Sequence, residues 1–290
     1  MRIAFLGLGL IGGSVARALR AGGMPGADVH LAAWTENGVG PRAALAAGVI
    51  DEVAGTPMAA IRDADLVVLA TPPLTCVTLL ARLGRDGDLR PHLAPGATVT
   101  DVASTKAAVL GAARAAGVPF VGGHPMAGRE TSGFEASDAG LFLDRPWVVT
   151  EAVHGGDPER VRALARACGA RVVELDAATH DRLVAAISHL PLLTAVALVE
   201  AVAGGDAAAA DWPGAGALAA SGWRDATRLA RGDVTMGTEI AVSNAPAIAG
   251  RLRDLRAAID EWIEILEAPG GPDSAEVRRR LSAARRRLEG

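Results

Sequence analysis

The 290-residue chain has few of the residues on which several protein classes depend. It contains no tyrosine, a single lysine (Lys106) and only two cysteines, Cys76 and Cys168. Two cysteines do not form a disulfide framework in a chain of this size, and no Cys/His cluster has metal-ligand spacing. We therefore expect two buried thiols in a reducing, cytoplasmic setting, and no bound metal.

An excess of positive charge is also missing, because the formal net charge is −4. A nucleic-acid-binding surface needs clustered basic residues, so we expect no nucleic-acid partner. The arginines at 278–280 and 285–287 lie among alanine and leucine at helical spacing, which indicates a solvated C-terminal helix, with a docking patch as the alternative. No apolar run reaches the length of a transmembrane span, and no signal-peptide cleavage site follows the apolar N-terminus, so we expect no membrane partner.

A glycine-rich motif stands near the start of the chain. Residues 2–6 are an apolar stretch, a helix is predicted at 14–20, and Gly7-Leu8-Gly9-Leu10-Ile11-Gly12 lies between them. This order of strand, G-x-G-x-x-G and helix is typical of dinucleotide-binding folds. The glycines permit a tight turn, close approach of the backbone to a pyrophosphate, and packing of helix on strand. We expect the cofactor contacts to include Gly7, Gly9, Leu10, Ile11 and Gly12.

The end of the second predicted strand, residues 29–34, bears on the choice between NAD and NADP. An acidic residue there binds the ribose 2′-hydroxyl of NAD. Thr35 occupies the expected position and Glu36 follows one residue later. No arginine follows Thr35, and Glu36 would repel a 2′-phosphate, so the pattern favours NAD and leaves NADP possible. Glu36 is alternatively a solvated loop charge.

The remaining pattern divides the chain into two parts. Half of the residues are apolar, and the length is sufficient for two domains. Predicted strands alternate with helices as far as residue 176, which indicates an α/β fold, a Rossmann-like, doubly wound, mostly parallel sheet over 1–176. Besides the strands at 2–6 and 29–34, we expect strands at 65–70, 98–102, 120–123, 147–150 and 171–175.

From 177 to 290 the pattern is helical, and it predicts an all-helical C-terminal domain that pairs with a copy of itself in a homodimer. Pro191 should kink a long helix over 181–200. We expect a loop at 204–216, and the remaining helical segments at 222–231, 239–267 and 275–288.

Polar side chains follow several of the predicted strands. His124 comes directly after Phe120–Gly123 and before a proline, Ser104 follows the strand at 98–102, and Thr71-Pro72 follows the strand at 65–70. Ligands bind at the carboxyl ends of such strands, and histidine exchanges protons near neutral pH. The alternatives are a loop histidine satisfied by backbone and a serine that caps the next helix.

The helical part offers a candidate anchor for an acidic substrate. Arg224 stands beside Trp223, and the guanidinium group binds both oxygens of a carboxylate. Its alternative is a surface ion pair with Asp225. Taken individually, His180 and His189 fit structural roles better than catalytic ones.

Together these motifs resemble the prephenate/arogenate dehydrogenase family. The similarity extends over about the first 230 residues, in family order. The glycine motif is common to many dehydrogenases, whereas the later elements are specific in combination. The matching stretches are Gly7 to Ser14, Thr71-Pro72, Asp101 to Lys106, Gly123-His124-Pro125-Met126-Ala127-Gly128, Ser188-His189-Leu190-Pro191 and Ser221-Gly222-Trp223-Arg224-Asp225.

The resemblance implies the oxidative decarboxylation of prephenate to 4-hydroxyphenylpyruvate in tyrosine biosynthesis, or of arogenate to tyrosine. His124 would take the proton of the ring hydroxyl, and Ser104 would orient His124, the substrate hydroxyl or the nicotinamide. The hydride acceptor would be NAD or NADP, bound also by Thr35, Glu36, Thr71 and Pro72. The substrate contacts that it implies are Ser188, His189, Trp223, Arg224, Arg228 and Glu130.

Two other functions compete with this interpretation. The β-hydroxyacid dehydrogenases also join a Rossmann domain to helices, but they resemble one another in using a lysine from the helical domain, and no lysine follows Lys106. A non-catalytic dinucleotide sensor would keep the glycine loop. It would have no reason to keep His124, Ser104 and Arg224 together.

Overall fold

The computed structural model describes residues 1–24, 28–129, 131–204 and 206–289. Within these ranges the chain forms an eight-stranded sheet in the order β3-β2-β1-β4-β5-β6-β7-β8. All neighbouring strands are parallel except β6 and β7, so the predicted Rossmann-like, mostly parallel sheet is confirmed. The strands are β1 (Arg2–Leu6), β2 (His30–Trp34), β3 (Glu52–Val53), β4 (Leu66–Leu69), β5 (Thr98–Asp101), β6 (Phe120–Pro125), β7 (Pro146–Val153) and β8 (Arg171–Glu174).

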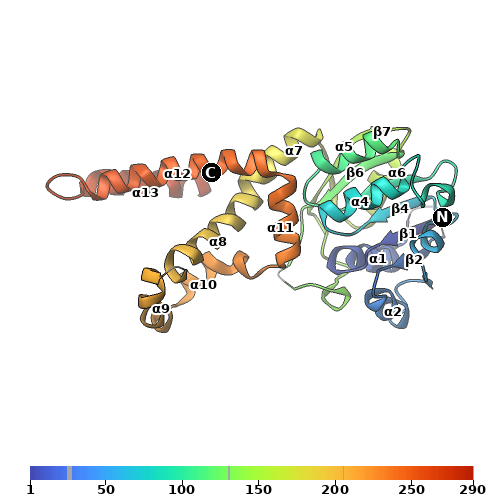
Figure 1. Cartoon of the computed structure of the whole chain (residues 1–290), viewed down its shortest axis with the longest axis horizontal. Helices are drawn as coiled ribbons and strands as arrows, with labels where there is room; N and C mark the ends of the chain where they lie inside the picture. Colours follow the sequence, from blue (N-terminus) through green and yellow to red (C-terminus); the bar gives the residue numbers. More distant parts are fainter. Residues whose placement is uncertain (25–27, 130, 205, 290) are drawn as a thin grey trace.

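Helices cover both faces of this sheet (Figure 1). On one face, α1 (Leu10–Gly22) and α6 (Pro158–Ala167) enclose a core that includes Phe5 and Trp147. On the other face, α3 (Pro57–Ile61), α4 (Pro73–Leu83) and α5 (Ala107–Ala116) enclose a core that includes Leu69 and Phe120. Burial on both sides explains why the central strands are continuous apolar runs. The smaller elements are α2 (Val39–Ala46), η1 (Arg90–His92) and η2 (Phe134–Ala136).

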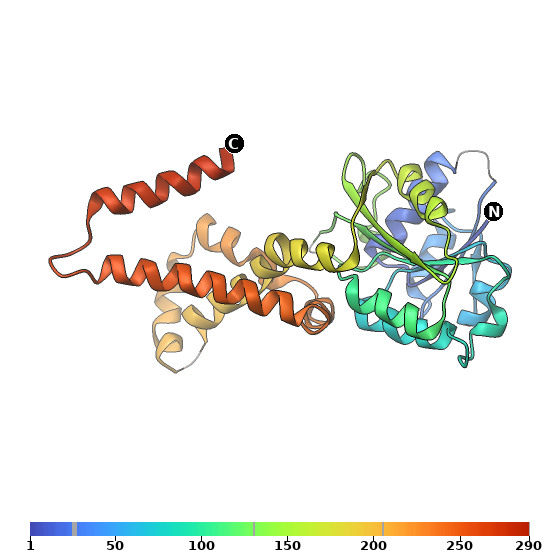
Figure 2. The same ribbon diagram turned by 90° about the horizontal axis from the view of Figure 1, so that it is seen from above.

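The rest of the described chain is helical and extends away from the sheet (Figure 2). Its own core is small and contains the buried side chains of Ala185, Ile240 and Ile248. The elements are α7 (Ala177–Val184), the π-helical turn η3 (Ala185–His189), α8 (Leu190–Ala203), α9 (Asp206–Leu218), α10 (Ser221–Thr227), η4 (Arg228–Arg231), α11 (Val234–Ser243), α12 (Ala245–Leu266) and α13 (Ser274–Glu289).

Three expectations from the sequence are wrong in detail. The loop predicted at 204–216 is largely α9, because its alanines favour a helix more strongly than its glycines oppose one. The segment at 239–267 is two helices that meet at Asn244, just before Pro246. The short edge strand β3 was missed because two residues carry no periodicity.

An irregular helical turn lies just before Pro191. Proline has no N–H to donate to the carbonyl four residues earlier. The chain forms the π-helical turn Ala185–His189 directly before α8, with Pro191 in the first turn of α8.

The elements α7, η3 and α8 form one continuous helix, Ala177–Ala203, whose most apolar window has a mean hydropathy of 1.9. By length and composition this helix could cross a membrane, so the expectation that no segment reaches that length is wrong. Helices that are buried in the core of a protein can have the same length and hydropathy. A single helix of this kind is therefore weak evidence for a transmembrane span. Only 22% of the window is buried within a single copy of the chain.

Candidate active site

His124 lies at the carboxyl end of β6, where the sheet faces the helical region. Two glycines precede it because the strand passes very close to its neighbours. A Cβ on Gly122 would lie 2.7 Å from Thr150 Oγ1, and one on Gly123 would lie 2.7 Å from the carbonyl oxygen of Asp101. The pairing of β6 with β7 also shifts register between Val121 and Gly123. Such an irregularity redirects the side chains that follow it.

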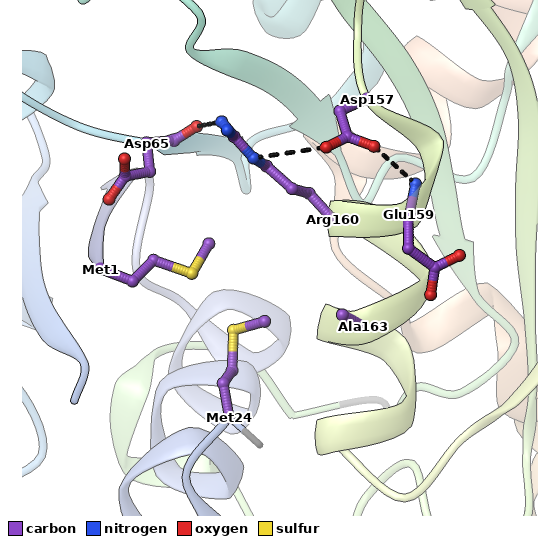
Figure 3. A pocket seen from close by; sticks show the side chains of 7 residues that line it. All are labelled: Met1, Met24, Asp65, Asp157, Glu159, Arg160 and Ala163. Atoms are coloured by element: carbon purple, nitrogen blue, oxygen red, sulfur yellow. Dashed lines mark hydrogen bonds and ion pairs between the residues drawn. The ribbon is translucent and has the colours of Figure 1, made fainter. Parts of the chain in front are cut away.

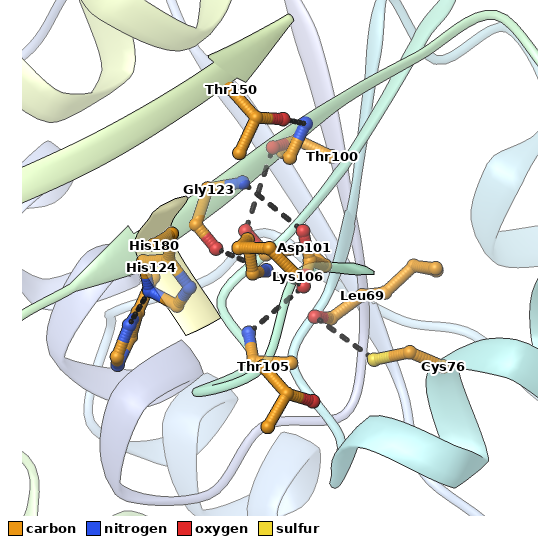
Figure 4. A network of polar contacts seen from close by, with 12 residues as sticks. Leu69, Cys76, Thr100, Asp101, Thr105, Lys106, Gly123, His124, Thr150 and His180 are labelled. Carbon is orange, nitrogen blue, oxygen red and sulfur yellow. Dashed lines mark hydrogen bonds and ion pairs between the residues drawn. The ribbon is translucent and has the colours of Figure 1, made fainter. Parts of the chain in front are cut away.

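A chain of hydrogen bonds starts at His124 and crosses into α7 (Figure 4). His124 Nδ1 lies 2.8 Å from His180 Nε2, and His180 Nδ1 lies 2.8 Å from Asp181 Oδ1. The Asp181 carboxylate also accepts the backbone N–H groups of Lys106 (2.7 Å) and Ala107 (2.9 Å) at the start of α5. Asp181 therefore anchors a relay that joins the sheet to the helical region.

The order of donors in this relay fixes the protons. An ionised carboxylate only accepts, so His180 donates from Nδ1 to Asp181, and in the neutral imidazole its Nε2 is then the acceptor. His124 consequently donates from Nδ1, which leaves a lone pair on its Nε2. That nitrogen has no hydrogen-bond partner among the described residues, and His124 is partly exposed. His124 is thus a neutral imidazole with a basic nitrogen available to a ligand.

The surroundings of His124 and Asp181 lower the pKa of both groups. Burial, together with the positive charge of Lys106 nearby, holds the pKa of His124 well below its usual value of 6.5. Burial acts to raise the pKa of Asp181, but the bond from His180 and the two backbone amides outweigh it and lower that pKa. A carboxylate beside a neutral histidine pair is the charge distribution that a general base requires.

A buried ion pair supports β6 from behind. Lys106, the only lysine, is bonded to Asp101, and its ammonium also donates to the carbonyl of Gly123 at 2.7 Å. Asp101 in turn accepts the N–H of Gly123 at 3.1 Å. Burial raises the pKa of Asp101, while the Lys106 ammonium acts against that shift. These bonds fix the backbone one residue before His124 (Figure 4).

The loop between β1 and α1 fits a dinucleotide. A Cβ on Gly7 would lie 2.3 Å from the carbonyl oxygen of Ala70, and one on Gly12 would lie 2.8 Å from the Ala70 side chain. A Cβ on Gly9 would meet nothing within 4 Å, so this backbone borders open space. Gly7 and Gly12 thus pack against the end of β4, while Gly9 leaves room for phosphate groups.

The β2–α2 loop lies next to the glycine loop, since Gly7 N–H donates to the carbonyl of Trp34 at 2.9 Å. Thr35 is partly exposed and Glu36 is exposed. Arg42, from the first turns of α2, folds back on this loop, and its Nη2 donates to the carbonyl of Asn37 at 2.9 Å. Arg42 lies seven residues after Thr35 in sequence, and the start of α2 returns its side chain to the loop.

Two of the proposed site residues have a buried polar atom without a partner among the described residues, Ser104 Oγ and His189 Nε2. Ser104 does not cap α5, because the first backbone N–H groups of that helix donate to the Asp181 carboxylate instead. His189 Nδ1 lies 3.2 Å from the amide nitrogen of Asn244, so His189 carries its proton on Nε2. Burial lowers the pKa of His189 to about 4, although Asp181 opposes the shift. Both atoms can serve a bound molecule, with His189 as a neutral donor.

The other proposed substrate contacts lie on the helical region. Ser188 is exposed on η3. Thr71 and Pro72, which belong to the proposed cofactor set, are partly exposed in the sheet domain between β4 and α4. Trp223 and Arg224 are on α10, which packs against α8, and the Trp223 ring lies 5.4 Å from that of Trp212. Arg228 follows on η4, which also packs against α8. Among the described residues, His124 makes no hydrogen bond or ring contact with Trp223 or Arg224, and Glu130 lies outside those residues.

A cavity of about 320 Å³ lies away from His124, at the amino ends of β1 and β4 (Figure 3). Its polar groups satisfy one another, because Arg160 donates to the carbonyl of Asp65 at 2.7 Å and pairs with Asp157 at 3.5 Å. We assign no chemistry to it. Within the described ranges, no group of three or more His, Cys, Asp or Glu side chains could hold a metal ion.

Comparison with known proteins agrees with this architecture. The family model "Prephenate dehydrogenase, nucleotide-binding domain" matches residues 15–174, and "Prephenate dehydrogenase, dimerization domain" matches residues 176–279. A prephenate dehydrogenase of Lactococcus lactis subsp. cremoris is 32% identical over 268 residues, which are 90% of this chain and 70% of that protein.

Solved structures give the same result. The arogenate dehydrogenase of Synechocystis has a TM-score of 0.77 and 31% identity, over 99% of this chain and 100% of that one. The prephenate dehydrogenase of A. aeolicus, solved with hydroxyphenyl propionate and NAD+, has a TM-score of 0.82 and 25% identity, over 100% and 98%. The resemblance inferred from the motifs is thus confirmed: the chain belongs to the prephenate dehydrogenase family of NAD(P)-dependent dehydrogenases.

Proposed function

We propose that this enzyme catalyses the oxidative decarboxylation of prephenate to 4-hydroxyphenylpyruvate, with NAD or NADP as the hydride acceptor. The observation that carries the proposal is the relay from His124 through His180 to Asp181, which leaves a lone pair on His124 Nε2. The family membership supplies the substrate class. Arogenate is the second candidate substrate, because the Synechocystis relative is an arogenate dehydrogenase.

In this mechanism His124 Nε2 accepts the proton of the ring hydroxyl. His124 then carries a positive charge, which the neutral His180 and the Asp181 carboxylate stabilise across two hydrogen bonds of 2.8 Å. The bound cofactor supplies the acceptor for the hydride that leaves the ring carbon. Loss of the ring carboxylate as carbon dioxide completes an aromatic ring, which makes the step effectively irreversible.

The remaining proposed site residues bind rather than transfer protons. Ser104 Oγ is free to hydrogen-bond the substrate hydroxyl or the nicotinamide. His189 would donate from Nε2 to a substrate oxygen, and Arg224 would bind a carboxylate. Ser188, Trp223, Arg228 and Glu130 complete the proposed substrate set; Gly7, Gly9, Leu10, Ile11, Gly12, Thr35, Glu36, Thr71 and Pro72 complete the cofactor set.

The assembly is also proposed. We place the domain boundary at 176/177, where the Asp176 side chain accepts the N–H of Thr179 and starts α7. The helical domain, 177–290, would form a homodimer, because most of the long apolar helix Ala177–Ala203 is not buried in one copy of the chain. We expect this dimer to be cytoplasmic. The dimerisation model matched to this region supports that proposal.

The test is to mix the purified protein with prephenate and follow the formation of reduced cofactor, with NAD and NADP in parallel and arogenate as the alternative substrate. Turnover that is lost in His124→Asn, with an unchanged circular dichroism spectrum, is the expected result. Turnover with arogenate but not with prephenate would make arogenate the substrate. Cofactor binding without turnover of either substrate would overturn the proposal in favour of a dinucleotide sensor.

A further inference from the structure

The start of α4 lacks a cap of its own and is capped from the helical region. Pro72 precedes the helix and provides no side-chain acceptor. Instead, Glu239 on α11 accepts the backbone N–H groups of Leu74 (2.6 Å) and Thr75 (3.2 Å). Its second oxygen lies 3.3 Å from the Thr75 hydroxyl. A carboxylate at a helix N-terminus is favourable, and here the two partners are 165 residues apart in sequence at the first bond.

Ser243 and Asn244, at the end of α11, make three more contacts near the relay. One turn after Glu239, Ser243 Oγ donates to the Glu239 carbonyl at 2.6 Å, so it accepts from the Thr105 hydroxyl at 2.9 Å. Thr105 stands between Ser104 and Lys106. Asn244 donates to the carbonyl of Asp181 at 2.9 Å and lies 3.2 Å from His189. One short segment therefore contacts two loops of the sheet domain and the relay.

We propose that Glu239 is a positioning residue whose carboxylate ties α11 to the start of α4 and holds the two domains at the spacing the reaction needs. The part of this proposal that concerns turnover rests on the proposed function; the tie itself does not. Because α4 directly follows Thr71 and Pro72, the tie couples the proposed cofactor loop to the helical domain. Coupling of this kind is reciprocal, so cofactor binding should in turn stabilise α11.

The experiment compares Glu239→Ala and Glu239→Gln with Glu264→Gln, a matched change of an exposed glutamate on α12. Hydrogen exchange is measured on peptides covering 72–80 and 234–244, with and without NAD. In the wild type, NAD should slow exchange in both peptides. In Glu239→Ala, the first peptide should exchange faster without NAD, and the protection of the second by NAD should be lost.

Steady-state kinetics then separate positioning from simple capping. A small displacement of reacting groups can cost up to about 10²-fold in rate, so we expect Glu239→Ala to lower kcat about 10-fold or more. Glu239→Gln, which keeps one acceptor oxygen, should retain more activity, and Glu264→Gln should match the wild type. Unchanged kcat and KM values in a Glu239→Ala protein with altered exchange would reduce Glu239 to a structural cap and overturn the proposal.

The exchange data also keep the two proposals apart. An inactive wild type would refute the proposed function, yet loss of NAD-dependent protection at α11 in Glu239→Ala would still support the tie. Exchange at 72–80 that is the same in wild type and Glu239→Ala would refute the tie whatever the activity.

Discussion

The properties of His124 as a base depend on which way its neighbours donate. Asp181 accepts from His180, His180 accepts from His124, and the basic nitrogen therefore faces outward. Sequence motifs predicted His124 because it follows a strand. They could not predict its partner, since His180 is 56 residues away and a single histidine followed by aspartate has no distinctive pattern. Asn244 and Glu239 were missed for the same reason, because only the fold brings Asn244 to His189 and Glu239 to the start of α4.

The pH dependence of the reaction tests this relay. Because the pKa of His124 lies well below 6.5, the imidazole is neutral and competent at neutral pH, and kcat/KM for prephenate should fall only in clearly more acidic solution. Asp181→Asn removes the charge that stabilises protonated His124, and we expect kcat to fall by about 10² or more. A wild-type profile with its acidic limb at 6.5, or an Asp181→Asn enzyme of normal kcat, would contradict the assignment.

The β2–α2 loop carries one acidic and one basic side chain that should influence the preference for NAD or NADP. Glu36 disfavours a 2′-phosphate and Arg42, on the Asn37 carbonyl, favours it. Arg42→Gln should weaken binding of 2′,5′-ADP about 10-fold and leave 5′-ADP unchanged, whereas Glu36→Gln should strengthen binding of 2′,5′-ADP. Calorimetric titration measures both. Equal effects of Arg42→Gln on the two nucleotides would exclude Arg42 from the 2′ position.

At the scale of elements, the longer strands of the sheet were predictable, whereas the two-residue strand β3 and the loops were not, or only partly so. Buried parallel strands are continuous apolar runs, which explains why β1, β4 and β5 were located to within about a residue. The helices of the second domain carry weaker signals, and the alanine-rich α9 was mistaken for a loop. The secondary structure of such segments depends on packing against distant parts of the chain. A local sequence pattern carries no information about that packing.

Within the glycine loop, we expect Gly7 to be needed for stability and Gly9 for cofactor binding. Gly7 has φ +99 and a Cβ there would meet Ala70, so Gly7→Ala should cost at least about 2 kcal/mol in unfolding free energy. Gly9→Ala fills open space and should leave the thermal midpoint nearly unchanged while weakening NAD binding at least about 10-fold. Thermal unfolding with and without NAD measures both effects. A Gly9→Ala protein with wild-type NAD affinity would show that the pyrophosphate binds elsewhere.

For the whole molecule, the buried histidines predict sensitivity to acid. The pKa of His189 is about 4 in the folded protein and about 6.5 when unfolded, so between these values only the unfolded chain binds the proton. Stability is therefore complete above about pH 6.5 and is lost as the pH falls towards 4, by up to about 3 kcal/mol from this group. Urea unfolding at pH 7 and pH 4.5 measures the loss, which should be smaller in His189→Asn. An equal loss in both proteins would assign the acid sensitivity to other groups.

The helical domain leaves apolar surface that one copy of the chain does not cover. Ile259, Ile263 and Leu266 are 48%, 46% and 58% exposed and recur at helical spacing along α12. A row of this kind is typical of a face that packs against another protein, and we expect it to contribute to the proposed dimer. Ile259→Glu with Ile263→Glu should shift the protein from dimer to monomer in light scattering. Leu143→Glu, a change of an equally exposed leucine on the sheet domain (60%), should leave the dimer intact. A wild-type monomer, or a dimer that survives the double substitution, would place the interface on other surfaces.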